Sequence, residues 1–212
     1  MTKIIFSRKG FDSSAGGVPS PIIKDEPLSI PIPYHRNTNL TYNDIGLGQM
    51  VSDLTNNKIS VNSTCHVDPF IETQAGLFGQ AGAAQSHLEN NNVEVGDLFL
   101  FWGWFRQTNY FNGKYTYSKK DPGHYRIFGW LQIGEIIKLG EDPSTYLKKE
   151  KRKFHNHPHT TGHWTKNNTL YIAKKKLNVF GIKDWQGHGK FKSSPKTNLS
   201  ADLFKEILHI AL

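Results

Sequence analysis

Cysteine and long hydrophobic runs are scarce in this chain of 212 residues. The single cysteine, Cys65, excludes an internal disulfide framework and a cysteine-rich zinc site, and it fits a reducing compartment. No run approaches the roughly 18 consecutive apolar residues of a membrane span, and the apolar part of residues 1–6 is too short for a signal peptide. We therefore expect a soluble, cytoplasmic protein with no membrane partner.

Familiar nucleotide and metal signatures are also missing. The glycines of residues 10–17 do not have the spacing of a Walker loop or a Rossmann fingerprint, and the histidines do not form an HExxH pattern. Any nucleotide site or histidine chemistry must therefore use another arrangement of residues. The sequence does not identify a cofactor.

Positive charge is concentrated in the second half of the chain. Residues 1–100 hold 6 Lys/Arg against 10 Asp/Glu, whereas residues 101–212 hold 20 against 8. Basic residues interleaved with aromatic ones suit a polyanion with stackable bases, and the densest run is Lys148, Lys149, Lys151, Arg152 and Lys153. The alternative is a solvated face that keeps the protein soluble.

Two aromatic, β-branched segments predict the centre of a sheet. Residues 93–105 and 125–137 are bounded by Gly, Asn, Asp and Pro, and they read as adjacent central strands. Apolar residues from 98 to 105 are almost unbroken, which indicates a strand buried on both faces. Gly103, Gly129 and Gly134 indicate bulges or points where another backbone or a ligand comes close.

Shorter patterns predict the remaining elements. Residues 2–7 and 168–173 read as strands, residues 22–34 as an extended segment with short edge pairing, and residues 106–124 as a polar hairpin or lid. Helices are expected over residues 41–54, capped by Thr41 or Asn43, and at the terminus over residues 199–208. Residues 77–88 read as a loop entering a helix of small residues.

The loop after the first strand is a candidate anion site. Residues 8–21 combine Arg8, Lys9, Asp12, hydroxyls at Ser13 and Ser14, and glycines that allow backbone amides to converge on a phosphate. Arg8 could add a bidentate fork. In the alternative reading, this is a turn-rich connection whose polar residues satisfy their own backbone.

Several other side chains are candidates for binding a base. Amides at Gln80 and Gln85 could contact a base edge, and His87 could be a general base. On the central strand and directly after it, the expected substrate contacts are Trp102, Trp104 and Arg106.

Residues 154–164 hold the histidine cluster of the chain. On an extended segment, His155, His157 and His159 would share one face, which suits a metal or proton transfer beside a phosphate. Pro158 excludes a helical site. We favour metal-free acid–base roles for His157 and His159, because the further candidates His66, Asp68 and His163 are not spaced to guarantee convergence with them.

Motifs along most of the chain give it a family resemblance. They are residues 7–14, 16–21, 30–33, 78–80, 83–85, 96–101, 103–106 and 157–159. In this order they resemble the third of the nucleotide-modification-associated domain families, found in bacterial and phage genomes near DNA-base modification systems. The resemblance implies a setting among modified nucleotides more than a mechanism. Residues 96–101 with 128–136 are also, more weakly, similar to the paired strands of PUA-like domains, which hold a base in an aromatic pocket.

Together these patterns predict one α+β domain over residues 1–212, built around a mixed, partly closed sheet with flanking helices and possibly a PUA-like core. Its expected partner is a nucleotide or DNA. As an enzyme it would transfer or hydrolyse a group, with Arg8 and Lys9 on phosphate, Asp12 or a histidine as acid or base, and Ser13 beside the substrate. Alternatively, the same site reads a modified base or sequesters a nucleotide signal without turnover. A third possibility is a metal-dependent hydrolase that uses the histidine cluster.

Overall fold

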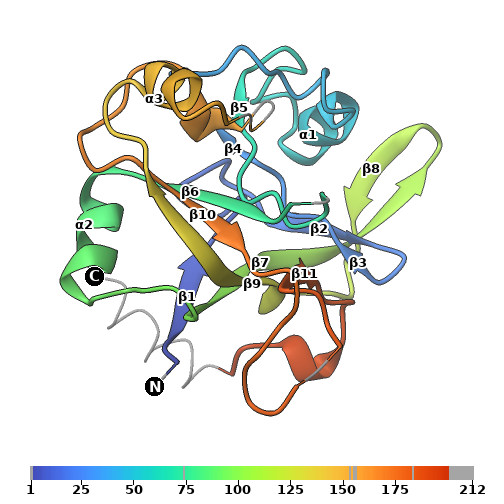
Figure 1. Cartoon of the computed structure of the whole chain (residues 1–212). Coiled ribbons are helices and arrows are strands. Elements are labelled where there is room, and N and C mark those ends of the chain that lie inside the picture. The colour runs from blue at the N-terminus through green and yellow to red at the C-terminus, as the bar shows by residue number, and fades with distance from the viewer. Residues whose placement is uncertain (1, 74, 153, 155–156, 183, 201–212) are drawn as a thin grey trace.

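The fold is α+β, with a large mixed sheet and short helices beside it (Figure 1). The computed structural model describes residues 2–73, 75–152, 154, 157–182 and 184–200. Within them the α-helices are α1 (Gly48–Leu54), α2 (Gly82–Asn90) and α3 (Pro143–Lys149), and 3₁₀ turns occupy Pro158–Thr160 and Pro195–Thr197. The strands are β1 (Ile4–Arg8), β2 (Ser20–Ile23), β3 (Glu26–Pro27), β4 (Ile32–Pro33), β5 (Cys65–His66), β6 (Leu77–Gln80), β7 (Leu98–Phe111), β8 (Lys114–Tyr117), β9 (His124–Lys138), β10 (Thr169–Ala173) and β11 (His188–Lys190).

The two long strands β7 and β9 form the centre of the sheet, as the sequence predicts. They pair antiparallel from Leu98 opposite Gln132 to Phe105 opposite His124, with a bulge after Phe101. The main path of the sheet runs β3-β2-β7-β9-β10-β6, and β11 also pairs with β9. The sheet is mixed and is not closed into a barrel, so the α+β class is confirmed.

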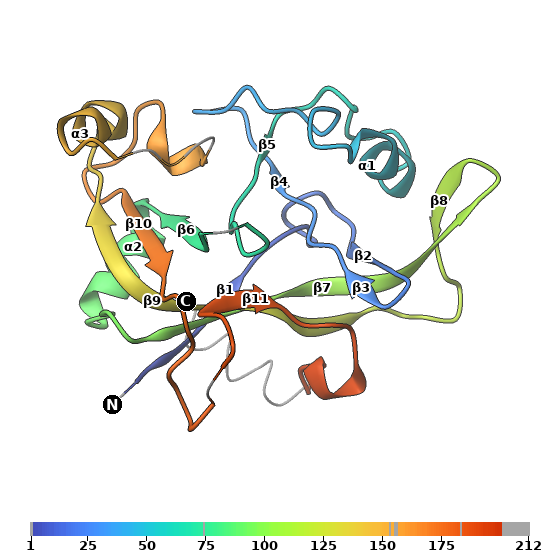
Figure 2. The same ribbon diagram turned by 45° about the vertical axis from the view of Figure 1, so that its right-hand side comes forward.

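The second edge of β7 is shared by three strands in succession. β1 pairs parallel with residues 98–102, β2 pairs parallel with residues 105–107, and β8 pairs antiparallel with residues 108–111. The loop between β1 and β2 is therefore tied at both ends to one strand. The predicted hairpin after the central strand is β7–β8, which projects from the body of the molecule (Figure 2).

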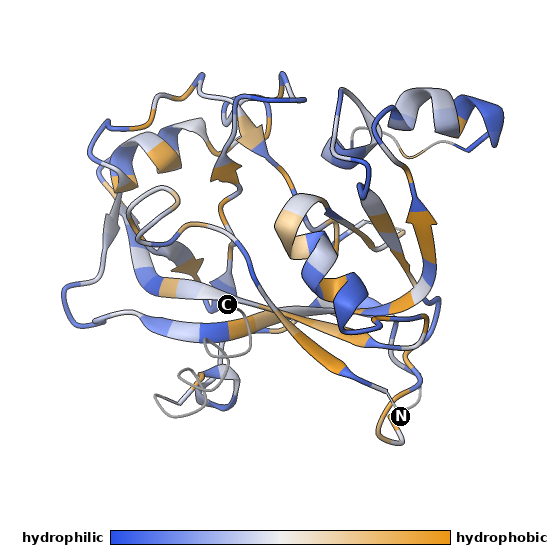
Figure 3. Cartoon of the chain, turned by 90° about the vertical axis from the view of Figure 1, so that its left-hand side faces the viewer, coloured by the Kyte–Doolittle hydropathy of each residue, from blue (hydrophilic) through white to orange (hydrophobic). Residues whose placement is uncertain are grey.

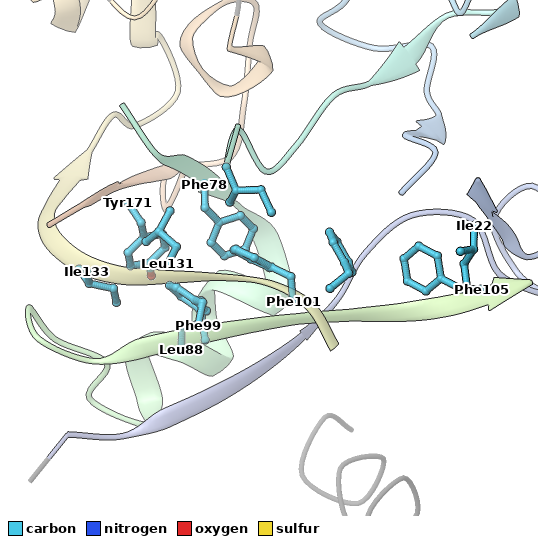
Figure 4. Close-up of a cluster of buried hydrophobic side chains, with 11 residues drawn as sticks. Ile22, Phe78, Leu88, Phe99, Phe101, Phe105, Leu131, Ile133 and Tyr171 are labelled. Atoms are coloured by element: carbon cyan, nitrogen blue, oxygen red, sulfur yellow. The ribbon is translucent and has the colours of Figure 1, made fainter. Parts of the chain in front are cut away.

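Aromatic side chains fill the core on one face of β7 and β9. Phe99 and Phe101 are two positions apart on β7, so both face the side of the sheet where Phe78 and Tyr171 lie. Figure 4 shows these rings gathered beside the sheet. Leu98 packs with Leu177 and Val179 in a separate cluster. Successive side chains of a strand point to opposite faces of the sheet, and other residues cover β7 on both faces. The predicted burial of both faces is thus confirmed.

The covering segments differ on the two faces. β4, β5, α1 and α3 lie on one side of β7 and β9, whereas the chain around β11 and the turn Pro195–Thr197 extends on the other (Figure 2). Hydrophobic residues lie along the central strands, and hydrophilic ones are frequent in the surrounding loops (Figure 3). Among the described residues, no helix has the length and apolar character needed to cross a membrane.

The three glycines of the central strands mark close approaches of another backbone, as predicted. A Cβ at Gly103 would lie 2.6 Å from the Lys9 carbonyl oxygen, and one at Gly134 would lie 2.8 Å from the Lys174 nitrogen. At Gly129 the Gly189 carbonyl oxygen would be 3.0 Å away. A side chain at Gly103 would therefore displace the start of the β1–β2 loop.

Some expectations need correction. The helix over residues 41–54 begins only at Gly48, because Thr41 hydrogen-bonds Asp44 in a turn and no side chain caps α1. Residues 77–80 form strand β6 rather than a loop, since they pair with β10. The expected terminal helix falls mostly outside the described residues. The PUA-like likeness is not confirmed, and the single domain over residues 1–212 stays a prediction.

Candidate functional site

A cavity of about 290 Å³ opens where β1 runs into its following loop. The β1–β2 loop supplies most of its wall, and β4 and β5 with the residues after β5 complete it. The lining residues are Arg8, Lys9, Gly10, Asp12, Ser14, Ala15, Ile32, His66 and Asp68. Four of the predicted site residues, Arg8, Lys9, Asp12 and Ser14, therefore meet at one cavity.

Asp12 organises the loop from within. One carboxylate oxygen, Oδ1, accepts hydrogen bonds from the Ser14 amide, the Ser14 hydroxyl and the Ala15 amide, each at 2.7 Å. Burial alone would raise the pKa of Asp12, but these bonds and the nearby Arg8 charge hold it below its ordinary value. Two amides that might have cradled an external anion thus bind the loop's own carboxylate, as the turn-rich reading expected.

Arg8 lies at the edge of the cavity with part of its guanidinium unused. Its Nε is 3.1 Å from Asp12 Oδ2, and its side chain is 49% exposed. In the described part of the chain, the two Nη nitrogens have no hydrogen-bond partner. The Asp12 contact fixes the orientation of the guanidinium and leaves a planar pair of donors for an anionic ligand.

Asp68 is the buried carboxylate of the site. Its side chain is 2% exposed, and Oδ1 accepts hydrogen bonds from the Gly79 amide and from His157 Nε2, both at 3.1 Å. Lys9 Nζ is 3.9 Å from Oδ2 and also lies 4.2 Å from the centre of the Phe78 ring. Asp68 therefore has one oxygen fully engaged and one directed toward a single cation.

His157 and His159 come from a 3₁₀ turn rather than an extended strand. Pro158 begins the turn Pro158–Thr160, so the predicted alternation onto one face is wrong. His157 Nδ1 accepts from the His159 amide, which leaves Nε2–H to donate to Asp68. His159 Nδ1 lies 2.7 Å from Asn168 Oδ1, while Asn168 Nδ2 donates to the His159 carbonyl. His159 Nδ1 is thus the protonated nitrogen, and its Nε2 keeps a free lone pair.

Aromatic rings pack against His66 and His159. The Trp164 ring stacks on His159 at 4.1 Å and 17°, and His66 meets the rings of Tyr34 and His159 edge-on at 5.0 and 5.2 Å. Gly79 makes room for His159, since a Cβ there would lie 2.1 Å from the His159 ring. These contacts restrict both imidazoles to narrow ranges of orientation.

Burial sets the protonation states of the cluster. It lowers the pKa of His66 to about 4 and that of His159 to about 3, although the Asp68 charge opposes both shifts. It would raise the pKa of Asp68, but the His157 hydrogen bond and the charge of Lys9 bring that pKa to about 2. Burial also lowers the pKa of Lys9, against the pull of Asp68. At neutral pH the imidazoles of His66 and His159 are therefore neutral and lie beside the ionised carboxylate of Asp68, which suits either proton acceptance or metal ligation.

Other predicted substrate contacts do not line the cavity. Gln85 is 2% exposed and accepts a hydrogen bond from the Tyr171 hydroxyl, so its amide serves the core. Trp102 is 1% exposed, and Arg106 donates to the Ser118 carbonyl within the β7–β8 hairpin. Three further candidates, namely Ser13, Gln80 and Trp104, are not among the lining residues either. The predicted general base His87 lies on α2 and is exposed.

In the basic run at residues 148–153, three lysines are exposed and one arginine is paired with an acidic residue. Lys148, Lys149 and Lys151 are exposed at the end of α3 and just after it. Arg152 instead makes two hydrogen bonds to Glu135, at 2.5 and 2.7 Å. Lys153 and His155 lie outside the described residues.

His66 and Asp68 contribute more to the site than their pattern in the sequence indicates. A histidine and an aspartate two positions apart are a common pattern. The residues that they contact, His157 and His159, are 89 to 93 positions further along the chain. Gly79 and Asn168 were missed because their roles depend on where β6 and β10 pair. A hint does exist, since the family-like motifs at residues 78–80 and 157–159 meet here around Gly79.

Comparisons with known proteins identify a family for this chain. No curated protein and no solved structure matches the chain. A family model described as nucleotide modification associated domain 3 matches residues 3–207, which include every residue that lines the cavity. A match over nearly the whole length shows membership rather than a shared motif. The chain therefore belongs to the nucleotide modification associated domain 3 family.

Proposed function

We propose that the protein binds a nucleotide, free or within DNA, in the Arg8 cavity and acts on it by hydrolysis or group transfer. Family membership supplies the association with nucleotide modification. The observation that carries the proposal is that one cavity combines a half-exposed guanidinium with a half-buried, neutral imidazole and an ionised carboxylate. The guanidinium can therefore bind an anionic group of a ligand while the imidazole and the carboxylate contact another part of it.

The cavity volume limits the ligand. Ligand pockets commonly measure about 300–1,000 Å³, so a site near 290 Å³ suits a single nucleoside or nucleotide better than a dinucleotide. A base within DNA would have to leave the stack to enter it.

The expected catalytic roles are unequal. Both oxygens of Asp12 contact the loop or Arg8, so Asp12 acts by positioning Arg8. Both ring nitrogens of His157 are likewise engaged, which makes it a positioning residue for Asp68. His159 does not line the cavity itself, but it lies beside His66 and Asp68, which do; without a metal its free Nε2 is the better candidate for proton transfer. Ser13 stays a candidate residue beside the substrate without a contact that supports it.

Calorimetry with nucleotides, matched nucleosides and single-stranded oligonucleotides tests the binding step. Removing Arg8 takes away charge-assisted hydrogen bonds worth about 1.5–3 kcal/mol, so Arg8→Ala should weaken nucleotide binding about 10- to 100-fold. Nucleosides, which lack phosphate, should be little affected. Lys114→Ala, which removes an exposed cation on β8, is the control and should bind normally.

Mass spectrometry of the same mixtures tests turnover. Conversion of a bound nucleotide that is lost in His159→Ala supports an enzyme. Tight binding with no product for any ligand would support the alternative, a reader of modified bases or a sequestering protein. Unchanged nucleotide affinity in folded Arg8→Ala, or no binding at all, would reject the cavity as the site.

A further inference from the structure

Three potential metal ligands converge beside the Arg8 cavity. His66, Asp68 and His159 each offer one ligand atom, and these atoms all lie within 4.8 Å of one another. Metal bonds of about 2.0–2.2 Å place donor atoms roughly 3.0–3.6 Å apart, so side-chain movements of about an ångström would close the set. His66 lies on β5, Asp68 follows it, and His159 comes from the turn after α3.

The neighbouring hydrogen bonds leave one ligand atom free on Asp68 and on His159. Asn168 engages His159 Nδ1 and so directs the lone pair of its Nε2 away from that bond. The Gly79 amide and His157 engage Asp68 Oδ1, leaving Oδ2. Metal-bound histidines usually donate their second N–H to such a partner, and ligating carboxylates are themselves hydrogen-bonded.

His66 supplies an independent observation that points to a ligand. Its Nδ1 is buried, yet it has no hydrogen-bond partner among the described residues. Buried polar atoms are almost always paired, and an exception needs an explanation such as an ion. Two imidazoles and a carboxylate whose ligand atoms converge, one imidazole having an unpaired buried nitrogen, form a set of ligands that suits a cation.

We infer that His66, Asp68 and His159 bind a divalent transition metal. This site differs from the predicted set His155, His157 and His159, and it contradicts the expectation of metal-free histidines. Two imidazoles and one carboxylate suit Zn²⁺, Fe²⁺, Mn²⁺ or Co²⁺ better than Mg²⁺ or Ca²⁺, which prefer oxygen ligands. Three protein ligands also leave open positions for water or for a substrate.

Among the described residues, Lys9 is the cation nearest to the proposed ligand oxygen of Asp68. Its Nζ is 3.9 Å from Asp68 Oδ2 and balances the buried carboxylate. A bound metal ion would balance the same carboxylate, so we expect metal binding to weaken the contact between Lys9 and Asp68. The inference goes beyond nucleotide binding and does not depend on it, because a metal can bind whether or not a nucleotide does.

Titration of chelator-treated, full-length protein tests the site directly. Zn²⁺ and Mn²⁺ are added in a calorimeter, and Co²⁺ is followed by its visible absorption. The wild type should bind a stoichiometric amount of metal, and His66→Ala and His159→Ala should each lose more than about tenfold in affinity. Asn168→Ala should lose about 10- to 100-fold, because it frees the His159 ring to rotate.

His87→Ala is the matched control, since it removes an exposed histidine on α2, and it should bind metal normally. Circular dichroism checks that each variant is folded. If the more buried His159→Ala fails to fold, His66→Ala alone decides the question. Absence of stoichiometric binding for all three metals, or unchanged affinity in folded His66→Ala, would overturn the inference without affecting the nucleotide test.

Discussion

Gly79 positions two groups of the candidate site at once. Its amide donates to Asp68, and the absence of its side chain leaves the space that the His159 ring occupies. Because Gly79 has no Cβ, the His159 ring can lie close to the Asp68 carboxylate. The fixed pairing of β6 with β10 holds Gly79 in this place, opposite Leu170.

Gly79→Ala should damage the site more than it damages the fold. The new Cβ would lie 2.1 Å from the His159 ring, so the ring must move, at a cost of about 1–3 kcal/mol in the free energy of unfolding. Metal affinity, measured by calorimetry, should fall at least as far as in Asn168→Ala.

Gly113→Ala separates the two effects. Gly113 has a φ of +77° and open space around its Cβ position, so alanine there adds backbone strain of about 1–2 kcal/mol without displacing a ring. Equal loss of metal affinity in both variants would show that the Gly79 effect is only a loss of stability.

At the scale of single elements, β7 links the core to the site. Phe101 on β7 packs edge-on against Phe78 at 5.2 Å between ring centres, and Phe78 lies directly beneath the Lys9 ammonium. The same strand, further along, leaves the core and ends in the β7–β8 hairpin, where Phe111 is 72% exposed. One strand therefore contains the same residue type in opposite environments.

Phe101→Ala and Phe111→Ala should differ sharply in urea unfolding. Removing the fully buried ring at Phe101 should lower the free energy of unfolding by about 3–5 kcal/mol. The exposed ring at Phe111 should change it by less than about 0.5 kcal/mol. Similar losses in the two variants would mean that the hairpin is covered in solution, for example by another molecule.

The sequence predicts the elements of this fold better than the site. Residues 98–105 and 125–137 have a composition that favours strands, and Gly103 and Gly134 mark where other backbones approach, so the central pair could be predicted directly. Residues 77–80 could not, because their strand state depends on β10, some ninety residues away. For His159 the sequence predicts an extended segment, whereas the structure has a 3₁₀ turn there. The sequence did not decide between the two, because Pro158 favours a tight turn as well as an extended segment.

At the scale of the whole molecule, the basic side chains differ in whether they are free to bind an anionic partner. Lys148, Lys149 and Lys151 are exposed, whereas both terminal nitrogens of Arg152 bind Glu135. The lysines can therefore neutralise phosphates without breaking an existing ion pair, and Arg152 cannot. Contiguity in sequence does not make these charges equivalent.

Salt dependence of oligonucleotide binding should reveal that difference. Each neutralised phosphate contributes roughly 0.7 to 0.9 to the slope of log affinity against log salt. Replacing Lys148, Lys149 and Lys151 by alanine should lower the slope by about 2 to 3, whereas Arg152→Gln should leave it nearly unchanged. Fluorescence anisotropy over a series of salt concentrations measures both. An unchanged slope in the triple variant would return these lysines to a role in solubility.

The pairing of β1 with the centre of the sheet has a consequence for how the chain is made. Ile4 lies opposite Leu98, so the first strand has to wait for a partner that is synthesised 94 residues later. Until then the β1–β2 loop, and with it Arg8 and Lys9, has no anchor, because both of its ends pair with β7. Contacts of such high sequence separation slow folding, since the loop must close before they stabilise anything. On the ribosome, β1 and β2 thus reach their native places only after β7 has emerged, and the cavity that Arg8 and Lys9 line cannot form before then.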